Sequence, residues 1–212
     1  VPRKAFIVRT APMDKNGYFN FGMNNSVTYA QIKSARKVIV EVNTNIPVCL
    51  GGAREQVHIS EVDYIVESEN EPLFALPSVD PTEVDRKIAE HVMYHIRDGC
   101  CVQLGIGAMP NLVGKMINET DLKDLGGNTE MLVDAYMDMW ESGKMNGRRK
   151  NVDDGKIVYT FALGSQELYD WMDNNPALAS YNVGYVNHPL RLASIDNLIS
   201  IKYNYKHLIC NI

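Results

Sequence analysis

The chain has 212 residues, of which 45% are hydrophobic and 22% are charged, and its formal net charge is −5. This length allows one good hydrophobic core or two modest domains, and the composition is ordinary for a soluble globular protein. The negative charge, with no basic block beyond Arg148-Arg149-Lys150, argues against nucleic acid or an anionic membrane as the main partner.

The four cysteines show no zinc-ligand spacing, and no signal peptide or long apolar run is present. The sequence therefore predicts a cytoplasmic protein with reduced, structural thiols and no bound metal.

The first third of the chain predicts short strands and one helix. Residues 4–10 and 38–42 have the pattern of strands, and Asn25 or Ser26 can cap a helix that runs to about Arg36. His58 is a possible catalytic base, but no partner is identifiable, so a structural or surface histidine is favoured. Residues 67–77 are acidic and contain proline, which predicts a linker between two domains.

After this linker, Asp80-Pro81-Thr82-Glu83 predicts a helix start, with Asp80 as the cap and Glu83 at the capping-box position. His91 and His95 on this helix have a metal-ligand spacing. Because no third ligand accompanies them, ordinary helix-face residues are favoured.

The most informative stretch covers residues 100–131. Residues 100–104 have the pattern of a buried strand, and Gly105-Ile106-Gly107 is expected to turn the chain. Pro110 is expected at the first position of the helix that follows. Such a turn offers backbone N–H groups to anionic or thioester oxygens. From the residues alone an ordinary connection is favoured, because the third glycine of the dinucleotide fingerprint is missing. Glu130 then follows two glycines, which can let a backbone approach a ligand closely.

The rest of the chain alternates between predicted helices and strands. Residues 132–141 are expected to form a helix with Asp134 and Asp138 on one face. Paired carboxylates suggest an acid/base pair, but an exposed acidic face or polar supports for Glu130 are favoured. Strands are expected at residues 156–163, 181–187 and 198–201, and helices are expected after Ser165 and at His188-Pro189. This alternation predicts a largely parallel sheet that binds ligands at its carboxyl edge, where Gly105 and Gly164 stand.

Several segments in order resemble the acetyl-CoA hydrolase/transferase family over about residues 5–201: ARKVIVEVN, VHISEVDYIVE, QLGIGAMPNLV, DLGGNTEM and GKIVYTFALGSQELYD. The resemblance, in particular to the butyryl-CoA:acetate and 4-hydroxybutyrate CoA-transferases, implies an α/β fold of two parallel-sheet units of the CoA-transferase type, incomplete at both ends. Residues 1–78 would be the C-terminal part of the first domain. Residues 79–212 would be the N-terminal part of the second.

The resemblance also implies an activity and a site. The activity is CoA transfer between butyryl-CoA or 4-hydroxybutyryl-CoA and acetate, with Glu130 as the nucleophile that becomes a glutamyl-CoA thioester. The implied CoA loop consists of Gly105, Ile106, Gly107, Ala108 and Met109. Coenzyme A is then a substrate, no cofactor is permanently bound, and the full-length form is expected to be a homo-oligomer. Asn128, where the family usually has histidine, and Thr129 would orient the glutamate.

Three alternatives stay open. An acyl-CoA hydrolase of the same family would use the same residues. A nicotinamide-dependent oxidoreductase is disfavoured, since GIGAMP lacks the third glycine and no acidic ribose partner is identifiable. A non-catalytic fragment is the third alternative, because the family proteins are roughly twice as long. If the chain is truncated, apolar surface is expected beside the last strand. Independently of this, Arg148-Arg149-Lys150 is expected to be a solvated loop, with a contact for CoA phosphates as the alternative.

Overall fold

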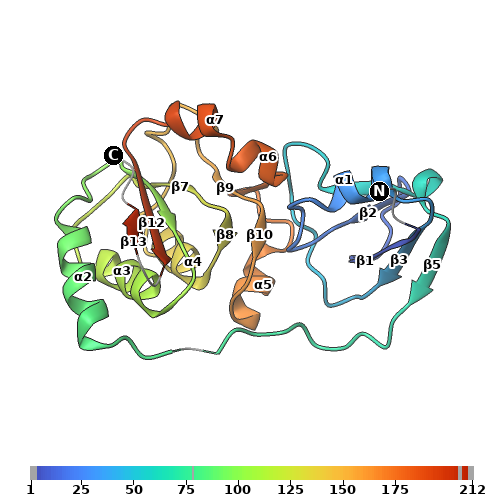
Figure 1. The fold of residues 1–212 in the computed structure, drawn as a ribbon, viewed down its shortest axis with the longest axis horizontal. Helices are drawn as coiled ribbons and strands as arrows, with labels where there is room; N and C mark the ends of the chain where they lie inside the picture. The colour runs from blue at the N-terminus through green and yellow to red at the C-terminus, as the bar shows by residue number, and fades with distance from the viewer. Residues whose placement is uncertain (1–3, 78, 205–206, 210–212) are drawn as a thin grey trace.

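The computed structural model describes residues 4–77, 79–204 and 207–209. They form two parallel sheets, each packed against helices, and the segment between the sheets runs along one side of the molecule (Figure 1). We call the part around the first sheet the first unit and the part around the second sheet the second unit. The expected α/β class with parallel sheets is confirmed.

The first unit has a three-stranded parallel sheet in the order β1-β3-β5 and an antiparallel pair, β2 with β4. Its elements are β1 (Phe6–Thr10), β2 (Tyr18–Asn20), α1 (Thr28–Ser34), β3 (Val38–Val42), β4 (Gln56–His58), a 3-10 helix (Ile59–Glu61) and β5 (Tyr64–Glu67). Its core is small and consists of seven buried side chains: Val8, Phe19, Phe21, Ile32, Val38, Val40 and Val57.

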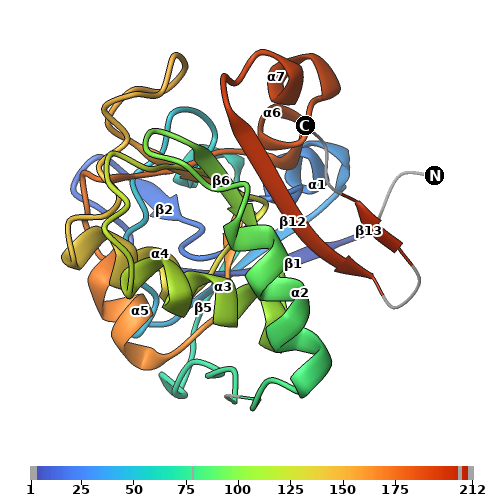
Figure 2. The ribbon, with the colours of Figure 1, turned by 90° about the vertical axis from the view of Figure 1, so that its left-hand side faces the viewer.

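The second unit contains a six-stranded sheet in the order β11-β9-β7-β6-β12-β13, parallel except for β13. The strands are β6 (Cys101–Leu104), β7 (Gly126–Asn128), β9 (Ile157–Tyr159), β11 (Leu178–Ser180), β12 (Leu198–Asn204) and β13 (His207–Ile209). A separate short parallel pair, β8 (Met131–Leu132) with β10 (Phe161–Ala162), follows β7 and β9. In this sheet β6 lies between β7 and β12, and Figure 2 shows β12 beside β6. The expected interior parallel strand before the glycine turn is therefore confirmed.

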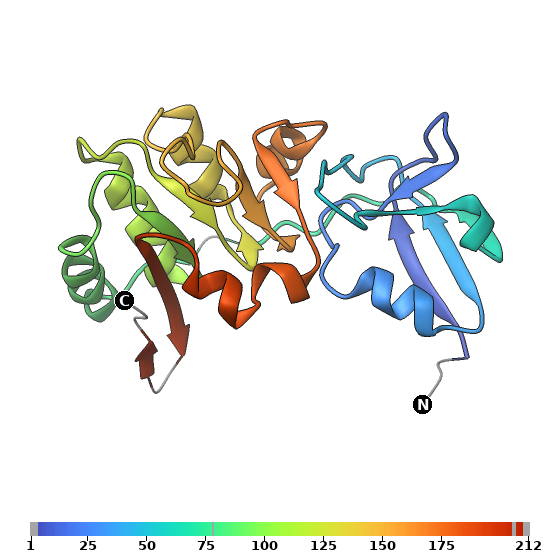
Figure 3. The same ribbon diagram turned by 90° about the horizontal axis from the view of Figure 1, so that it is seen from above.

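Helices cover both faces of this sheet (Figure 3). On one side lie α2 (Glu83–Met93), α3 (Ala108–Asn118), α4 (Asp134–Glu141) and α5 (Gln166–Met172), and on the other lie the short helices α6 (Val183–Val186) and α7 (Pro189–Ala193). The main core fills the first side, where side chains of β6 such as Leu104 meet Val113 and Ile117 of α3 and Tyr136 of α4. No helix among the described residues is long and apolar enough to cross a membrane.

Two predicted helix starts were each wrong by two residues. The cap of α2 is Thr82, whose hydroxyl accepts from the Asp85 amide (3.2 Å) while the Asp85 carboxylate accepts from the Thr82 amide (2.8 Å). This capping box is better formed than the one expected from Asp80, because a hydroxyl and a carboxylate satisfy each other's backbone donors. Pro110 is the third residue of α3, still within the first turn, where a missing N–H costs nothing.

The predicted strand over residues 181–187 was also wrong. The strand β11 ends at Ser180, and Asn182 caps α6 by accepting a hydrogen bond from the Tyr185 amide (3.1 Å). The Asn182 side chain gives the backbone a hydrogen bond that a sheet would otherwise supply, which favours a helix. This effect outweighs the preference of the β-branched residues Val183 and Val186 for a strand.

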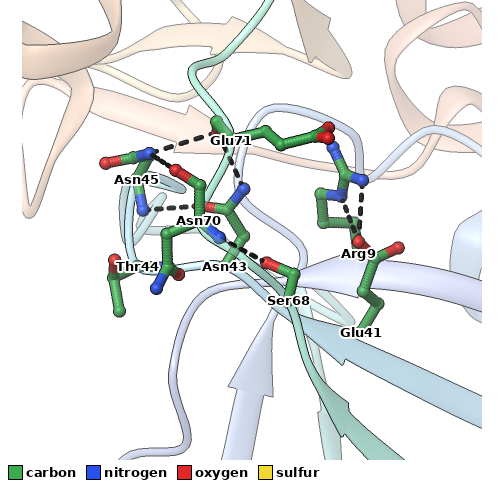
Figure 4. Close-up of polar contacts among 8 residues, drawn as sticks. All are labelled: Arg9, Glu41, Asn43, Thr44, Asn45, Ser68, Asn70 and Glu71. Atoms are coloured by element: carbon green, nitrogen blue, oxygen red, sulfur yellow. Dashed lines mark hydrogen bonds and ion pairs between the residues drawn. The ribbon is translucent and has the colours of Figure 1, made fainter.

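The predicted linker has a defined conformation because both of its ends are hydrogen-bonded. At its start, the Asn43 side chain donates through Nδ2 to Glu71 O (3.0 Å), and the Asn45 side chain donates through Nδ2 to Asn70 O (2.7 Å) and Glu71 O (3.1 Å) (Figure 4). Towards its end, the Tyr169 hydroxyl donates to Phe74 O (2.8 Å). The linker is therefore fixed to the loop after β3 of the first unit and to α5 of the second.

Candidate functional site

The glycine turn and Glu130 lie at the carboxyl ends of two neighbouring parallel strands. In the register of β6 with β7, Cys101 pairs with Gly126 and Val102 with Gly127. Beyond the ladder, the Thr129 hydroxyl lies 3.2 Å from Leu104 O. Because Leu104 precedes the glycine turn and Thr129 precedes Glu130, the two predicted elements meet at the same edge of the sheet.

The turn presents only part of the predicted CoA loop. The Gly105 amide donates to Ile201 O (2.8 Å), so it serves the sheet, and the Met109 side chain is buried in the main core. Gly107 has φ 124°, and a Cβ there would meet nothing closer than Pro110 Cδ at 3.9 Å. The Ile106 side chain is 52% exposed. The part of the loop that is open to a ligand is therefore Ile106, Gly107 and Ala108, at the start of α3.

Glu130 is half-buried, and its backbone is firmly held. Its carbonyl oxygen accepts hydrogen bonds from the amides of Thr160 and Phe161, both at 3.1 Å. These two residues stand at the break between β9 and β10, which the sequence predicted as one continuous strand. The break turns two successive amides toward a single carbonyl and fixes the position of the glutamate.

Two polar side chains, Thr129 and Asn128, come directly before Glu130 in the chain. The Thr129 hydroxyl lies between Leu104 O and Met131 O (2.9 Å), so it bonds to backbone carbonyls. Asn128 is fully buried, and neither its Oδ1 nor its Nδ2 has a hydrogen-bond partner among the described residues. In this structure, Asn128 therefore does not orient Glu130 by a direct hydrogen bond.

Side chains of the protein itself fill the space beside the two glycines before Asn128. A Cβ on Gly126 would lie 2.5 Å from Lys150 Cγ, and one on Gly127 would lie 2.8 Å from Ile157 Cγ2. The expectation that these glycines open a path for a ligand was wrong, because packing already fills the space beside them.

Lys150 crosses this glycine pair and is itself buried, with 8% exposure. Its ammonium donates to Gly127 O (3.0 Å) and Lys156 O (2.6 Å), and burial lowers its pKa. Arg149 in the same triplet pairs with Asp124 at 2.8 Å. Lys150 therefore holds the amino ends of β7 and β9 together and is not available to a phosphate.

The two aspartates of α4 serve other roles. The Asp134 carboxylate accepts from the Ser165 hydroxyl (2.5 Å) and amide (3.0 Å), which ties the start of α4 to the start of α5. Burial, together with the charge of Asp134, raises the pKa of Asp138.

His58 bonds to the Ser60 hydroxyl within its own loop (2.8 Å). No cluster of three metal-ligating side chains occurs among the described residues.

The first unit contributes residues 23–26 to a junction with the bend at Thr160. The amides of Asn25 and Ser26 donate to Thr160 O (3.1 and 2.9 Å), and the Ala162 amide donates to Met23 O (2.8 Å). Phe21, Met23 and Asn24, with Phe74 of the linker, line a groove of about 410 Å³ beside this contact. Hydrogen bonds to backbone carbonyls leave no residue-type signal, so the sequence could not reveal this junction.

Comparison with known proteins matches two models of one family. The N-terminal domain model of the acetyl-CoA hydrolase/transferase family matches residues 4–77, and the C-terminal domain model matches residues 164–207. The chain belongs to the acetyl-CoA hydrolase/transferase family. The resemblance predicted from the sequence is thereby confirmed.

Within the acetyl-CoA hydrolase/transferase family, the curated relatives are named as transferases. The chain is 50% identical over 201 residues to a probable butyrate:acetyl-CoA coenzyme A-transferase of Syntrophomonas wolfei, covering 95% of the chain and 45% of the relative. It is 50% identical over 196 residues to the butyryl-CoA:acetate CoA-transferase of Anaerostipes caccae, covering 92% of the chain and 44% of the relative.

Solved structures of similar proteins have the same fold. RipA from Yersinia pestis superposes with a TM-score of 0.88 at 39% identity, over 94% of this chain and 45% of RipA. The 4-hydroxybutyrate CoA-transferase of Porphyromonas gingivalis superposes with a TM-score of 0.86 at 33% identity, over 95% and 50%. The chain thus spans about half the length of the relatives that it matches.

Proposed function

We propose that this chain is part of an acyl-CoA:carboxylate CoA-transferase in which Glu130 is the nucleophile and the Gly105–Met109 turn binds the CoA thioester. The observation that carries the proposal is the contact of Thr129 with Leu104, which sets Glu130 beside the glycine turn. The names of the relatives support the reaction class. As butyrate and acetate occur in those names, we propose butyryl-CoA and acetate as the substrates, with 4-hydroxybutyryl-CoA as an alternative acyl donor.

The proposed chemistry conserves the free energy of the thioester. A Glu130 carboxylate oxygen attacks the acyl-CoA carbonyl, the C–S bond breaks, and CoA leaves as a thiolate. An acyl-glutamyl anhydride remains on the protein. The thiolate then attacks the glutamyl carbonyl carbon, and the C–O bond breaks to release the first acid. The second carboxylate reverses both steps. No net proton is needed, and a carboxylate is already ionised near pH 7.

The two ends of the site have separate tasks in this proposal. The backbone N–H groups at the start of α3 stabilise the oxygen of the substrate carbonyl as it gains charge. The hydrogen bonds from Thr160 and Phe161 to Glu130 O hold the nucleophile at the distance that attack requires. Exclusion of water then decides between transfer and hydrolysis.

We further propose that residues 1–78 and 79–212 are parts of the family's first and second α/β domains, and that the full-length form is a homo-oligomer. A hydrolase is the second candidate, because the family models cover both activities by name. If acetate accelerates the consumption of butyryl-CoA, the protein is a transferase, and if only water serves as acceptor, it is a hydrolase.

The experiment that tests the nucleophile needs a single turnover only. The full-length form is incubated with butyryl-CoA, reduced with borohydride, and mapped by peptide mass spectrometry. The modification is expected on Glu130 and absent from Glu130→Gln. Label on Cys100 or Cys101, or no label at all, would refute the assignment. Steady-state exchange is expected to be unmeasurable with the 212-residue chain alone, so the full-length form is used for the trap.

A further inference from the structure

The sequence contains two Asn-Gly pairs, Asn16-Gly17 and Asn146-Gly147, and the structure places them in different environments. Asparagine is among the thermolabile residues. In an Asn-Gly pair the glycine amide nitrogen can attack the asparagine side-chain carbonyl, because glycine has no side chain to hinder the approach. The attack requires that the asparagine side chain rotates and that the glycine amide leaves its own hydrogen bond.

The first pair lies in the turn between β1 and β2. Asn16 is exposed, and Gly17 is half-buried with φ 85°. The Gly17 amide donates to Asp14 O within the same turn (3.1 Å). Hydrogen bonds from the Tyr18 amide, the Asn16 amide and the Asn16 side chain lower the pKa of the exposed Asp14 carboxyl. Since exposed turns open at little cost in free energy, both reacting groups are released often from these contacts.

The second pair is held more firmly. The Asn146 side chain donates through Nδ2 to the Asp124 carboxylate (2.9 Å) and accepts through Oδ1 from the Arg148 amide (3.0 Å). The Gly147 amide donates to Leu125 O (3.0 Å), and Gly147 is buried. Three hydrogen bonds must therefore open, at a partly buried position, before this pair can react.

We propose that Asn16 is a site of spontaneous deamidation, whereas the fold protects Asn146. The Gly17 nitrogen loses its proton to solvent and bonds to Asn16 Cγ. The Cγ–Nδ2 bond breaks, ammonia leaves, and a succinimide ring remains. Water then adds to one ring carbonyl, and the C–N bond at that carbonyl breaks. Attack at the side-chain carbonyl gives aspartate, and attack at the backbone carbonyl gives isoaspartate. One water is consumed and one ammonia is released, without an oxidant or a reductant.

The modification changes the turn in two ways. Each product carries a new negative charge close to Asp14, whose carboxylate accepts from the Tyr18 amide (2.8 Å). Isoaspartate also adds one carbon to the backbone of the turn, next to Gly17, whose carbonyl accepts from the Ile59 amide (2.8 Å). Deamidation therefore acts on the β2–β4 pair, and Phe21, directly after β2, lines the groove of about 410 Å³.

The test follows both pairs in one sample. The full-length form is kept at mildly alkaline pH in water enriched in heavy oxygen, and a parallel sample is kept unfolded in urea. Peptide mass spectrometry counts the products that contain heavy oxygen, and electron-transfer dissociation separates isoaspartate from aspartate. In the folded protein, Asn146 is expected to react at least about tenfold more slowly than Asn16, because each additional hydrogen bond that must open slows the reaction about twofold to tenfold. In urea the two rates are expected to be similar.

Asn16→Gln is the matched variant, because it keeps a side-chain amide but can close only a larger ring, which forms much more slowly. It should abolish the product at this position and leave the rate at Asn146 unchanged. Gly17→Ala is not suitable, since a Cβ at φ 85° would lie 3.0 Å from His58 Nε2.

Two outcomes would overturn the inference. One is that Asn16 and Asn146 react at equal rates in the folded protein. The other is that folding slows the reaction of Asn16 as strongly as that of Asn146. The inference does not depend on the role of Glu130, so neither outcome bears on the proposed function.

Discussion

Tyr136 offers a sharp test of how the end of β6 is held in front of the glycine turn. Its hydroxyl accepts from the Leu104 amide (2.8 Å) and lies 3.3 Å from Val102 O, and its side chain is fully buried. Tyr136→Phe leaves both backbone groups buried without this partner. The expected loss in the free energy of unfolding is about 1–3 kcal/mol, because the desolvation of the orphaned amide is not offset.

The assay is equilibrium unfolding in urea. With a slope of about 2 kcal/mol per molar, the midpoint should fall by roughly 0.5–1.5 M while the slope stays constant. Burial raises the pKa of Tyr136, so the hydroxyl stays neutral and the loss should be the same at pH 6 and pH 9. Tyr94→Phe, at an exposed position, is the control and should change stability by less than about 0.5 kcal/mol. Equal effects of the two substitutions would refute the reasoning.

Three further predictions concern packing, charge and surface. Gly126→Ala should lower the free energy of unfolding by about 1–3 kcal/mol in urea titrations, since the new Cβ would lie 2.5 Å from Lys150 Cγ. Burial lowers the pKa of Lys150 below 10.5, so the unfolded chain binds more protons just below that pH. Stability should therefore rise with pH through that window, and Lys150→Met should flatten the rise. Leu192 lines a groove of about 960 Å³ beside β12, whereas Leu190 does not, although it is 76% exposed. Leu192→Lys should reduce concentration-dependent self-association in sedimentation, and Leu190→Lys should not.

The sequence predicted the parts of the fold that depend on local pattern. The apolar run before Gly105 became β6, and Ser165 caps α5 through the Leu168 amide (3.2 Å) as expected. It also predicted that Gly105 and Gly164 stand at the carboxyl edge of a parallel sheet. Periodicity and capping carry this information because they act between residues a few positions apart.

The sequence could not predict the contacts between distant backbone groups. Residues 156–163 look like one strand, yet the chain bends at Thr160, where hydrogen bonds to Glu130 and to the first unit replace the sheet ladder. Gly126 and Gly127 suggest an open approach, but their partners, Lys150 and Ile157, come from later in the chain and fill it. Long-range packing decides both cases, and no short-range pattern reports it.

The bend at Thr160 joins the two units to the candidate nucleophile. Thr160 gives its amide to Glu130 O and its carbonyl to the segment before α1, so two backbone hydrogen bonds link Asn25 to Glu130. The linker also joins the two units, because it is bonded to Asn43 and Asn45 at one end and to Tyr169 at the other. A covalent catalyst needs its nucleophile held to within fractions of an ångström. The polar linker and the Thr160 junction therefore have the same consequence as the sheet itself, which is to fix where Glu130 stands.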